Sequence, residues 1–308
     1  MQIGKIEEEA KQLQLAAITL SNSLRYGMFS SLFVGQGIDF DSCREYELND
    51  DIRYIDWNLT ARTGHPFVKL YNEERDIALF VIIDASDSMS AYTVAACGTE
   101  TYFEKAKELA ALFFFAGFHL SCRIGGIIFS DTVEKLVVPK QGSDFVFSLI
   151  HILKNMTIKE SAKSNLSDAL KLTSSVLTKR SLVVVISDFK INNYEKKLSL
   201  LSKTHDIIAI KIFSENDYAL PNCGLLELYD SENNTGLFIN TASKKSQLQY
   251  KQNFNKDLQL WENRCIDIGV LPCKLSLTAN PVKEITRFLM SAKNKYEAIG
   301  SFKKNRQA

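Results

Sequence analysis

Apolar residues follow two alternating patterns along this chain. Three short runs are apolar at nearly every position: residues 77–84 (IALFVIID), 181–188 (SLVVVISD) and 206–213 (DIIAIKIF). Such runs are typical of β-strands that are covered on both faces. Between them, apolar residues recur at helical spacing, as in residues 102–120 and 193–204. Strands that alternate with helices predict an α/β fold, with a mostly parallel sheet and helices on both faces.

The same patterns divide the chain into three parts. We expect an N-terminal extension over residues 1–75, an α/β core over residues 76–215 and a C-terminal part over residues 216–308 that packs on the core. The extension begins with an amphipathic helix pattern at residues 5–24, and its next forty residues have no clear period. The C-terminal part has strand-like segments at residues 225–230, 235–241 and 273–278, a long polar helix at 243–266 and a closing helix from Pro281.

Charge and cysteine content narrow the class of function. Lys and Arg number 37 against 36 for Asp and Glu, so we do not expect a nucleic-acid binder. The six cysteines form no CxxC pair, which is typical of thiols in a reducing compartment rather than of a zinc site. The N-terminus has three consecutive Glu and is not typical of a signal peptide, and the longest uncharged apolar stretch, residues 109–122, is short for a membrane span. We therefore expect a cytoplasmic protein with no membrane span.

Two of the apolar runs end in an aspartate, Asp84 and Asp188. Each could cap a following helix. However, ligands of open parallel sheets bind at the carboxyl ends of the strands. Ser86 and Ser88 alternate with Asp84 in the stretch DASDSMS, so their oxygens can converge on one point. Ser164 adds a hydroxyl just before another predicted helix, in a loop that we expect at the same sheet edge.

These five side chains offer only oxygen atoms, which are the ligands that hard divalent cations prefer. Two carboxylates balance the charge of a dication, so a further anionic ligand is not repelled. We predict a metal site for Mg²⁺, with Mn²⁺ or Ca²⁺ as alternatives, in which Asp188 acts directly or through water. The remaining ligand would be an Asp or Glu of a partner protein. The predicted ligands are Asp84, Ser86, Ser88, Ser164 and Asp188.

The pattern Asp84-x-Ser86-x-Ser88, with a hydroxyl residue on a second loop and an aspartate on a third, resembles the metal-ion-dependent adhesion site (MIDAS) of von Willebrand factor A-type domains. Ser164 stands where those domains usually have Thr. The longer stretch of residues 44–89 (REYELNDDIRYIDWNLTARTGHPFVKLYNEERDIALFVIIDASDSM) resembles the signature of a bacterial domain-of-unknown-function family, number fifty-eight. This is the MoxR-associated von Willebrand A-like group.

The resemblance covers about residues 25–290. One departure from the family pattern is Asn49, which stands in place of Gly, and Asn also tolerates a left-handed conformation. The resemblance implies a von Willebrand A-like fold and a non-enzymatic, protein-binding role beside a MoxR-type AAA+ ATPase.

Two other functions stay open. Phosphatases with an aspartate nucleophile also place it after an apolar strand, but they need a second carboxylate two residues further on, where this chain has Ser86. The sequence contains no GxSxG, HExxH or GxxxxGK[ST] motif. A structural protein with a degenerate metal site is the other alternative. We expect that the protein is not an enzyme.

A charged cluster precedes the first apolar run. It could be a functional surface, but we favour a network of ion pairs and hydrogen bonds that orders a segment poor in apolar residues, with Tyr54 and Trp57 as packing anchors. The glycine pair at residues 125–126 lies inside a strand pattern, so we do not expect a dinucleotide cradle there. The cluster consists of Arg44, Asp50, Asp51, Arg53, Asp56 and Arg62.

Overall fold

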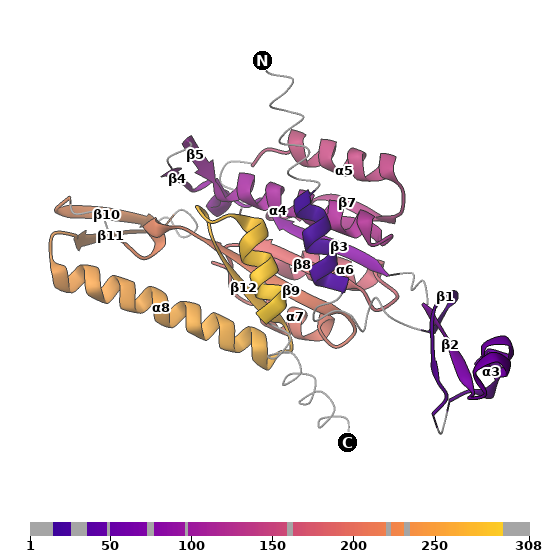
Figure 1. The fold of residues 1–308 in the computed structure, drawn as a ribbon. Helices are drawn as coiled ribbons and strands as arrows, with labels where there is room; N and C mark the ends of the chain where they lie inside the picture. The colour runs from indigo at the N-terminus through magenta and orange to yellow at the C-terminus, as the bar shows by residue number, and fades with distance from the viewer. Residues whose placement is uncertain are drawn as a thin grey trace, which may run out of the picture.

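A six-stranded sheet forms the centre of the protein in a computed structural model, which describes residues 15–25, 36–47, 50–72, 77–95, 98–158, 163–219, 223–230 and 235–291 (Figure 1). From one edge to the other the strands are β7 (Val133–Lys140), β6 (Arg123–Phe129), β3 (Ala78–Asp84), β8 (Leu182–Ser187), β9 (Asp206–Phe213) and β12 (Leu271–Ser276). All neighbours pair in parallel except β7 with β6. This is the 3-2-1-4-5-6 order of doubly wound folds. The predicted α/β class is confirmed.

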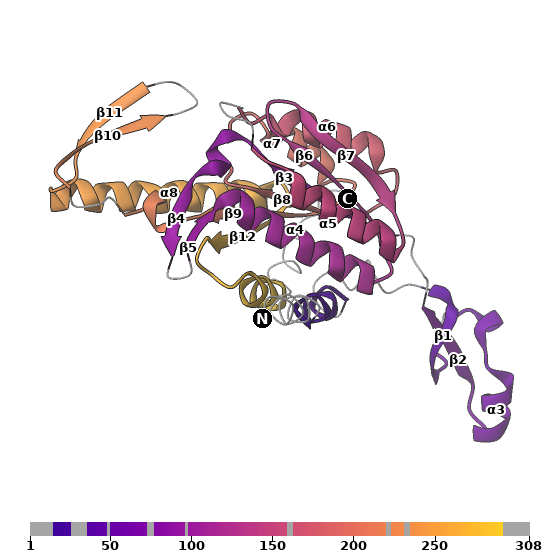
Figure 2. The same ribbon diagram turned by 90° about the horizontal axis from the view of Figure 1, so that it is seen from above.

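Helices cover both faces of the sheet, as Figure 2 shows from above. One face packs against α4 (Tyr102–His119), α5 (Ser143–Asn155) and the helices at residues 15–25 and 281–291. The other face packs against α6 (Leu166–Val176), α7 (Glu195–Leu201) and the end of α8 (Lys244–Asp267).

The central strand β3 serves both faces of this core. Leu79, Val81 and Ile83 point to the first face, whereas Phe80 and Ile82 point to the second, and all residues of β3 are buried. Each large apolar side chain contributes about 1.5–3 kcal/mol when it is buried. A slip in register would exchange the two faces, so the position of Asp84 at the end of this strand is well defined.

Two glycines allow β6 to lie close to its neighbours. A Cβ atom on Gly126 would lie 2.5 Å from the carbonyl oxygen of Val81 in β3, and one on Gly125 would lie 2.7 Å from that of Val137 in β7. No side chain fits into either space. The glycine pair therefore lies within the sheet, as the strand pattern predicted.

Several shorter elements lie outside the sheet. β1 (Gln36–Glu45) pairs with β2 (Phe67–Asn72), with η1 (Ile52–Tyr54) and α3 (Trp57–Thr63) between them. β4 (Tyr92–Ala95) pairs with β5 (Gly98–Thr101), and β10 (Leu225–Asp230) pairs with β11 (Thr235–Asn240). The two remaining short helices are η2 (Asp87–Ser90) and η3 (Glu215–Asp217). β1, α3 and the β4–β5 hairpin were not expected. The helix expected at residues 5–24 is observed from residue 15, and residues 5–14 lie outside the described part of the chain.

Hydrogen bonds and ion pairs order the charged cluster of residues 44–62. Arg44 Nη2 lies 2.6 Å from Asp50 Oδ1, and Asp51 caps η1 while it binds Arg53. Asp56 caps α3 by accepting hydrogen bonds from the backbone N–H groups of Asn58 and Leu59. These contacts agree with the structural interpretation of the cluster. Arg62 makes no ion pair with any other residue that the structure describes.

The prediction that Tyr54 and Trp57 are packing anchors is wrong. Tyr54 is 39% exposed and Trp57 is 66% exposed. They lie on η1 and at the start of α3, two short helices in which no residue is buried. Polar caps rather than aromatic packing therefore hold this segment in shape.

Candidate metal site

Three loops at the carboxyl ends of the parallel strands meet at the carboxylate of Asp84. This residue is fully buried at the end of β3. Its Oδ1 atom accepts a hydrogen bond of 2.9 Å from the backbone N–H of Ser86 in its own loop. Its Oδ2 atom accepts hydrogen bonds from the hydroxyl of Ser164 at 2.9 Å and from that of Ser187 at 2.7 Å. The structure thus places Ser164 beside Asp84, as the sequence predicted.

The two predicted ligand serines of the first loop, Ser86 and Ser88, lie close to each other. Ser86 Oγ and Ser88 Oγ are 3.2 Å apart, and Ser86 is fully buried. The short helix η2 holds them in this position, because the N–H of Met89 donates to the carbonyl of Ser86 at 3.0 Å and the Met89 side chain is buried in the core. The first loop therefore presents its hydroxyls as one group.

Asp188 follows β8, the strand next to β3, and is 2% exposed. Its Oδ1 atom accepts a hydrogen bond of 3.2 Å from the N–H of Lys190. Its Oδ2 atom is buried, and no described residue donates a hydrogen bond to it. The nearest cation is the Lys190 ammonium group at 4.0 Å, which also donates a 2.9 Å hydrogen bond to Asp217 Oδ1. The Asp188 Oδ2 atom is therefore a buried acceptor available to a cation.

Neither aspartate caps an α-helix, which was the alternative interpretation. Asp84 and Asp188 each bond to the backbone N–H of the residue two positions further on. The next α-helices begin later, with Thr101 as the cap of α4 and Tyr194 at the cap position of α7.

The carboxyl ends of β3 and β8, with the loops that meet there, form the rim of the sheet. The electrostatics of this rim disfavour two ionised carboxylates side by side. Burial and then the charge of Asp188 raise the pKa of Asp84 to about 6, although hydrogen bonds from Ser86 and Ser187 partly offset this. Burial opposes ionisation of Asp217, but the charge of Lys190 and the hydrogen bonds from Tyr102, Ser214 and Lys190 together outweigh it and lower the pKa of Asp217. Lys190 is therefore already paired with Asp217, and a second cation would stabilise the ionised form of Asp84.

Several residues of the site were not expected. Ser187 is a hydroxyl residue that follows the five apolar residues 182–186. Lys211 is the one cation in the apolar run of residues 206–213. Lys211 Nζ donates to the backbone carbonyl of Asp188 at 2.7 Å, and burial lowers its pKa. The hydroxyl of Tyr102 donates to Asp217 Oδ2. An isolated polar residue in a buried strand is the signal that could have identified Ser187 and Lys211.

The residues present fit a hard divalent ion. Within the described ranges, no group of three or more His, Cys, Asp or Glu side chains could hold a metal. Any ion at the rim would therefore depend on two carboxylates together with serine hydroxyls. This all-oxygen set suits Mg²⁺ rather than a softer metal such as zinc.

The strand order, the antiparallel edge strand and the rim of three loops define a von Willebrand A-like α/β domain. A family model described as "Protein of unknown function DUF58" matches residues 42–259, and the chain belongs to this family. The uncharacterized proteins Mb1516 of Mycobacterium bovis and Rv1480 of Mycobacterium tuberculosis are each 25% identical over 230 residues, which make up 74% of this chain and 71% of the relative.

Solved structures with a similar arrangement have low sequence identity. BatB from Bacteroides thetaiotaomicron matches with a TM-score of 0.44 and 14% identity, over 71% of this chain and 99% of that chain. An aerotolerance-related membrane protein from Bacteroides fragilis matches with a TM-score of 0.42 and 13% identity over the same shares. The SpRpn10 VWA domain matches with a TM-score of 0.36 and 13% identity, over 68% of this chain and 93% of that domain. In the part of this chain that the structure describes, no helix has the length and apolar character needed to cross a bilayer.

Proposed function

We propose that this protein is a divalent-metal-dependent protein-binding domain. The observation that supports the proposal is the pairing of two buried carboxylates, one of which has an oxygen without a hydrogen-bond donor. Asp84 is held by three loops, and Asp188 Oδ2 lies buried on the adjacent strand end. A buried acceptor without a partner costs about 1–3 kcal/mol, which a bound cation would offset.

The predicted ligands can bind an ion without giving up the contacts that position them. A serine hydroxyl has one proton and two lone pairs. Ser164 can therefore continue to donate to Asp84 while its oxygen faces a metal ion. Of Ser86 and Ser88, one hydroxyl can donate to the other while both oxygens keep a lone pair for the ion. Asp84 and Asp188 would balance the charge of the dication, with Asp188 acting directly or through water.

The bound ion would supply an attraction for an acidic side chain of another protein. The two carboxylates neutralise a dication, so that the site does not repel an incoming Asp or Glu. The likeness of residues 44–89 to the MoxR-associated signature supports a MoxR-type AAA+ ATPase as that partner. The cytoplasmic location expected from the cysteine pattern belongs to the same proposal.

The proposal is tested by measuring Mg²⁺ binding and partner binding on matched variants. Asp84→Asn keeps the shape of the side chain but removes its charge, and we expect it to lose Mg²⁺ binding in calorimetry. Asp87→Asn is the control, because Asp87 belongs to the same loop but is not a predicted ligand. Coprecipitation with the organism's MoxR-type ATPase should require Mg²⁺ and fail with EDTA. Equal loss of Mg²⁺ binding in both variants, or EDTA-resistant coprecipitation that survives Asp84→Asn, would contradict the proposal.

The absence of enzymatic activity is part of the proposal and has its own test. A phosphatase with Asp84 as the nucleophile would hydrolyse a generic phosphate ester in the presence of Mg²⁺. We expect no turnover that depends on Asp84. Hydrolysis by the wild type that Asp84→Asn abolishes would support the enzymatic alternative instead.

A further inference from the structure

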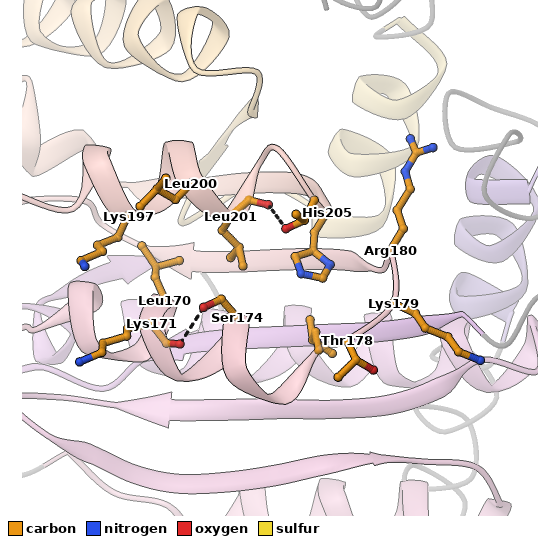
Figure 3. A pocket seen from close by; sticks show the side chains of 12 residues that line it. Leu170, Lys171, Ser174, Thr178, Lys179, Arg180, Lys197, Leu200, Leu201 and His205 are labelled. Atoms are coloured by element: carbon orange, nitrogen blue, oxygen red, sulfur yellow. Dashed lines mark hydrogen bonds between the residues drawn. The ribbon is translucent and has the colours of Figure 1, made fainter. Parts of the chain in front are cut away.

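A pocket with a volume of about 360 Å³ lies between α6 and α7 (Figure 3). Its walls come from α6 and the turn that leads into β8, and from α7 and the turn that leads into β9. It therefore lies at the amino ends of these strands, whereas the candidate metal site lies at their carboxyl ends. A six-residue strand spans about 20 Å, so the two sites are separate.

The pocket is basic. Its lining includes Lys171, Lys179, Arg180 and Lys197, and of the described residues that line it none is acidic. Arg180 binds Asp206 through two hydrogen bonds of 2.7 and 2.9 Å, so its charge is balanced.

Two of these lysines frame the pocket from opposite helices. Lys171 on α6 and Lys197 on α7 form no ion pair with another residue in the described part of the chain. Figure 3 shows their ammonium groups at the same end of the pocket. Two unneutralised cations that face one opening attract an anion with two negative charges.

A buried histidine points to a ligand independently of the lysines. His205 lines the pocket and is only 4% exposed, and its ring lies between the two helices in Figure 3. Its Nδ1 atom is buried without a hydrogen-bond partner among the described residues. Burial lowers the pKa of this imidazole below its ordinary value, which favours the neutral ring with one donor and one acceptor nitrogen. Such an orphaned atom is costly unless a bound molecule satisfies it.

The remaining walls combine leucines with the hydroxyl residues Ser174, Thr178 and Thr204. Leu200 offers apolar surface to a ligand because it is 58% exposed, whereas the lining residues Leu170, Leu177 and Leu201 are almost fully buried. The volume lies within the range of small-molecule sites, at about 300–1,000 Å³. We propose that this pocket binds a small organic phosphate, with the phosphate group between Lys171 and Lys197 and the apolar body over the leucines beside His205. A phosphate monoester carries a charge of about −1.5 to −2 at neutral pH, which matches two lysines better than a single carboxylate does.

Calorimetry on the full chain tests this proposal, with adenosine monophosphate, adenosine and inorganic phosphate as probes. EDTA is included in all titrations, so that the rim metal plays no part. We expect saturable binding of adenosine monophosphate, weaker binding of inorganic phosphate and no detectable binding of adenosine. Lys171→Glu and Lys197→Glu should each weaken the binding of adenosine monophosphate by about tenfold or more. The matched control is Lys196→Glu, because Lys196 is an exposed neighbour on α7 that does not line the pocket.

Three results would overturn the proposal. One is the absence of saturable binding of either phosphate probe at concentrations up to about 10 mM. Another is an equal loss of affinity in Lys196→Glu and Lys197→Glu, which would indicate general surface charge. The third is tighter binding of inorganic phosphate than of adenosine monophosphate, which would exclude a role for the leucines. Asp84→Asn should leave these affinities unchanged, so this test does not depend on the proposed metal site.

Discussion

The hydroxyl of Ser187 donates a 2.7 Å hydrogen bond to Asp84 Oδ2, although 103 positions separate the two residues. Ser187 is fully buried, and its oxygen also accepts a 2.9 Å hydrogen bond from the N–H of Phe189. One side chain thus connects the loop after β3 to the loop after β8. The protein's own hydrogen bonds hold the two aspartate-bearing loops together.

Ser187→Ala should therefore destabilise the protein. The substitution removes a donor to Asp84 and leaves the N–H of Phe189 without its acceptor, so we expect a loss of about 1–3 kcal/mol in the free energy of unfolding. Urea denaturation at neutral pH measures this loss. Ser199→Ala on α7 is the control, because the Ser199 hydroxyl makes no hydrogen bond to a described residue. Equal stability of the two variants would contradict the expected role of Ser187.

The stability of the metal-free protein should depend on pH through Asp84. The pKa of Asp84 is about 6 in the folded state, against 3.8 in the absence of the fold. The folded state therefore binds more protons in this window, and the associated stability is complete below pH 3.8 and lost as the pH rises through about 6. The upper limit is about 3 kcal/mol. In EDTA, the wild type should lose stability relative to Asp84→Asn as the pH rises across this window. A difference in stability that does not change with pH would contradict this role of Asp84.

Mg²⁺ affinity should rise with pH, whereas the stability of the metal-free protein falls. A metal ion needs the ionised carboxylate, so protons compete with it at and below the pKa of about 6 for Asp84. We expect Mg²⁺ affinity to fall by about tenfold per pH unit below that pKa. Calorimetric titrations between neutral and mildly acidic pH measure the slope. A pH-independent affinity would show that Asp84 is not a ligand.

Ser164 allows a test of the second loop. Ser164→Ala removes an oxygen and a donor to Asp84, and it should weaken Mg²⁺ binding by about tenfold or more. Ser164→Thr keeps the oxygen and restricts its rotamer, so it should bind Mg²⁺ at least as well as the wild type. Ser167→Ala is the control, because the Ser167 hydroxyl donates to the backbone carbonyl of Asn193 and makes no hydrogen bond to Asp84 or Asp188. Unchanged affinity in Ser164→Ala would remove this residue from the site.

Gly126→Ala should damage the sheet itself. The added methyl group would lie 2.5 Å from the backbone oxygen of Val81, and neither strand can move without disturbing the core. We expect a loss of at least about 1–3 kcal/mol, measured by thermal denaturation. At Gly117 the nearest atom is the flexible Ile124 side chain at 3.1 Å, so Gly117→Ala should cost less. The reverse order would contradict the close approach of β6 and β3.

The sheet could be predicted from the sequence because its strands are covered on both faces. Such strands are apolar at nearly every position, as in residues 182–186, and recognising the pattern needs no knowledge of the partner strands. In contrast, β1 has the mixed sequence QGIDFDSCRE and is a strand because β2 pairs with it. The exposure of Trp57 could not be predicted either, since an aromatic residue in a charged segment is equally consistent with a packing role.

The candidate site was predictable in part for a related reason. Neighbouring parallel strands end at the same rim, so an aspartate after β3 and another after β8 must lie near each other. The bond between Ser187 and Asp84 depends on the detailed geometry of these strand ends. The pairing of Lys190 with Asp217 depends on where η3 folds back after β9. Sequence spacing contains no information on either contact.

The outermost strands of the sheet limit how this protein can associate with others. β7 contains Pro139 together with lysines, and β12 contains Pro272 and Lys274. Proline cannot donate a backbone hydrogen bond, and lysine at a border strand discourages the addition of a foreign strand. Lateral growth of the sheet into fibrils or strand-exchanged dimers is therefore disfavoured.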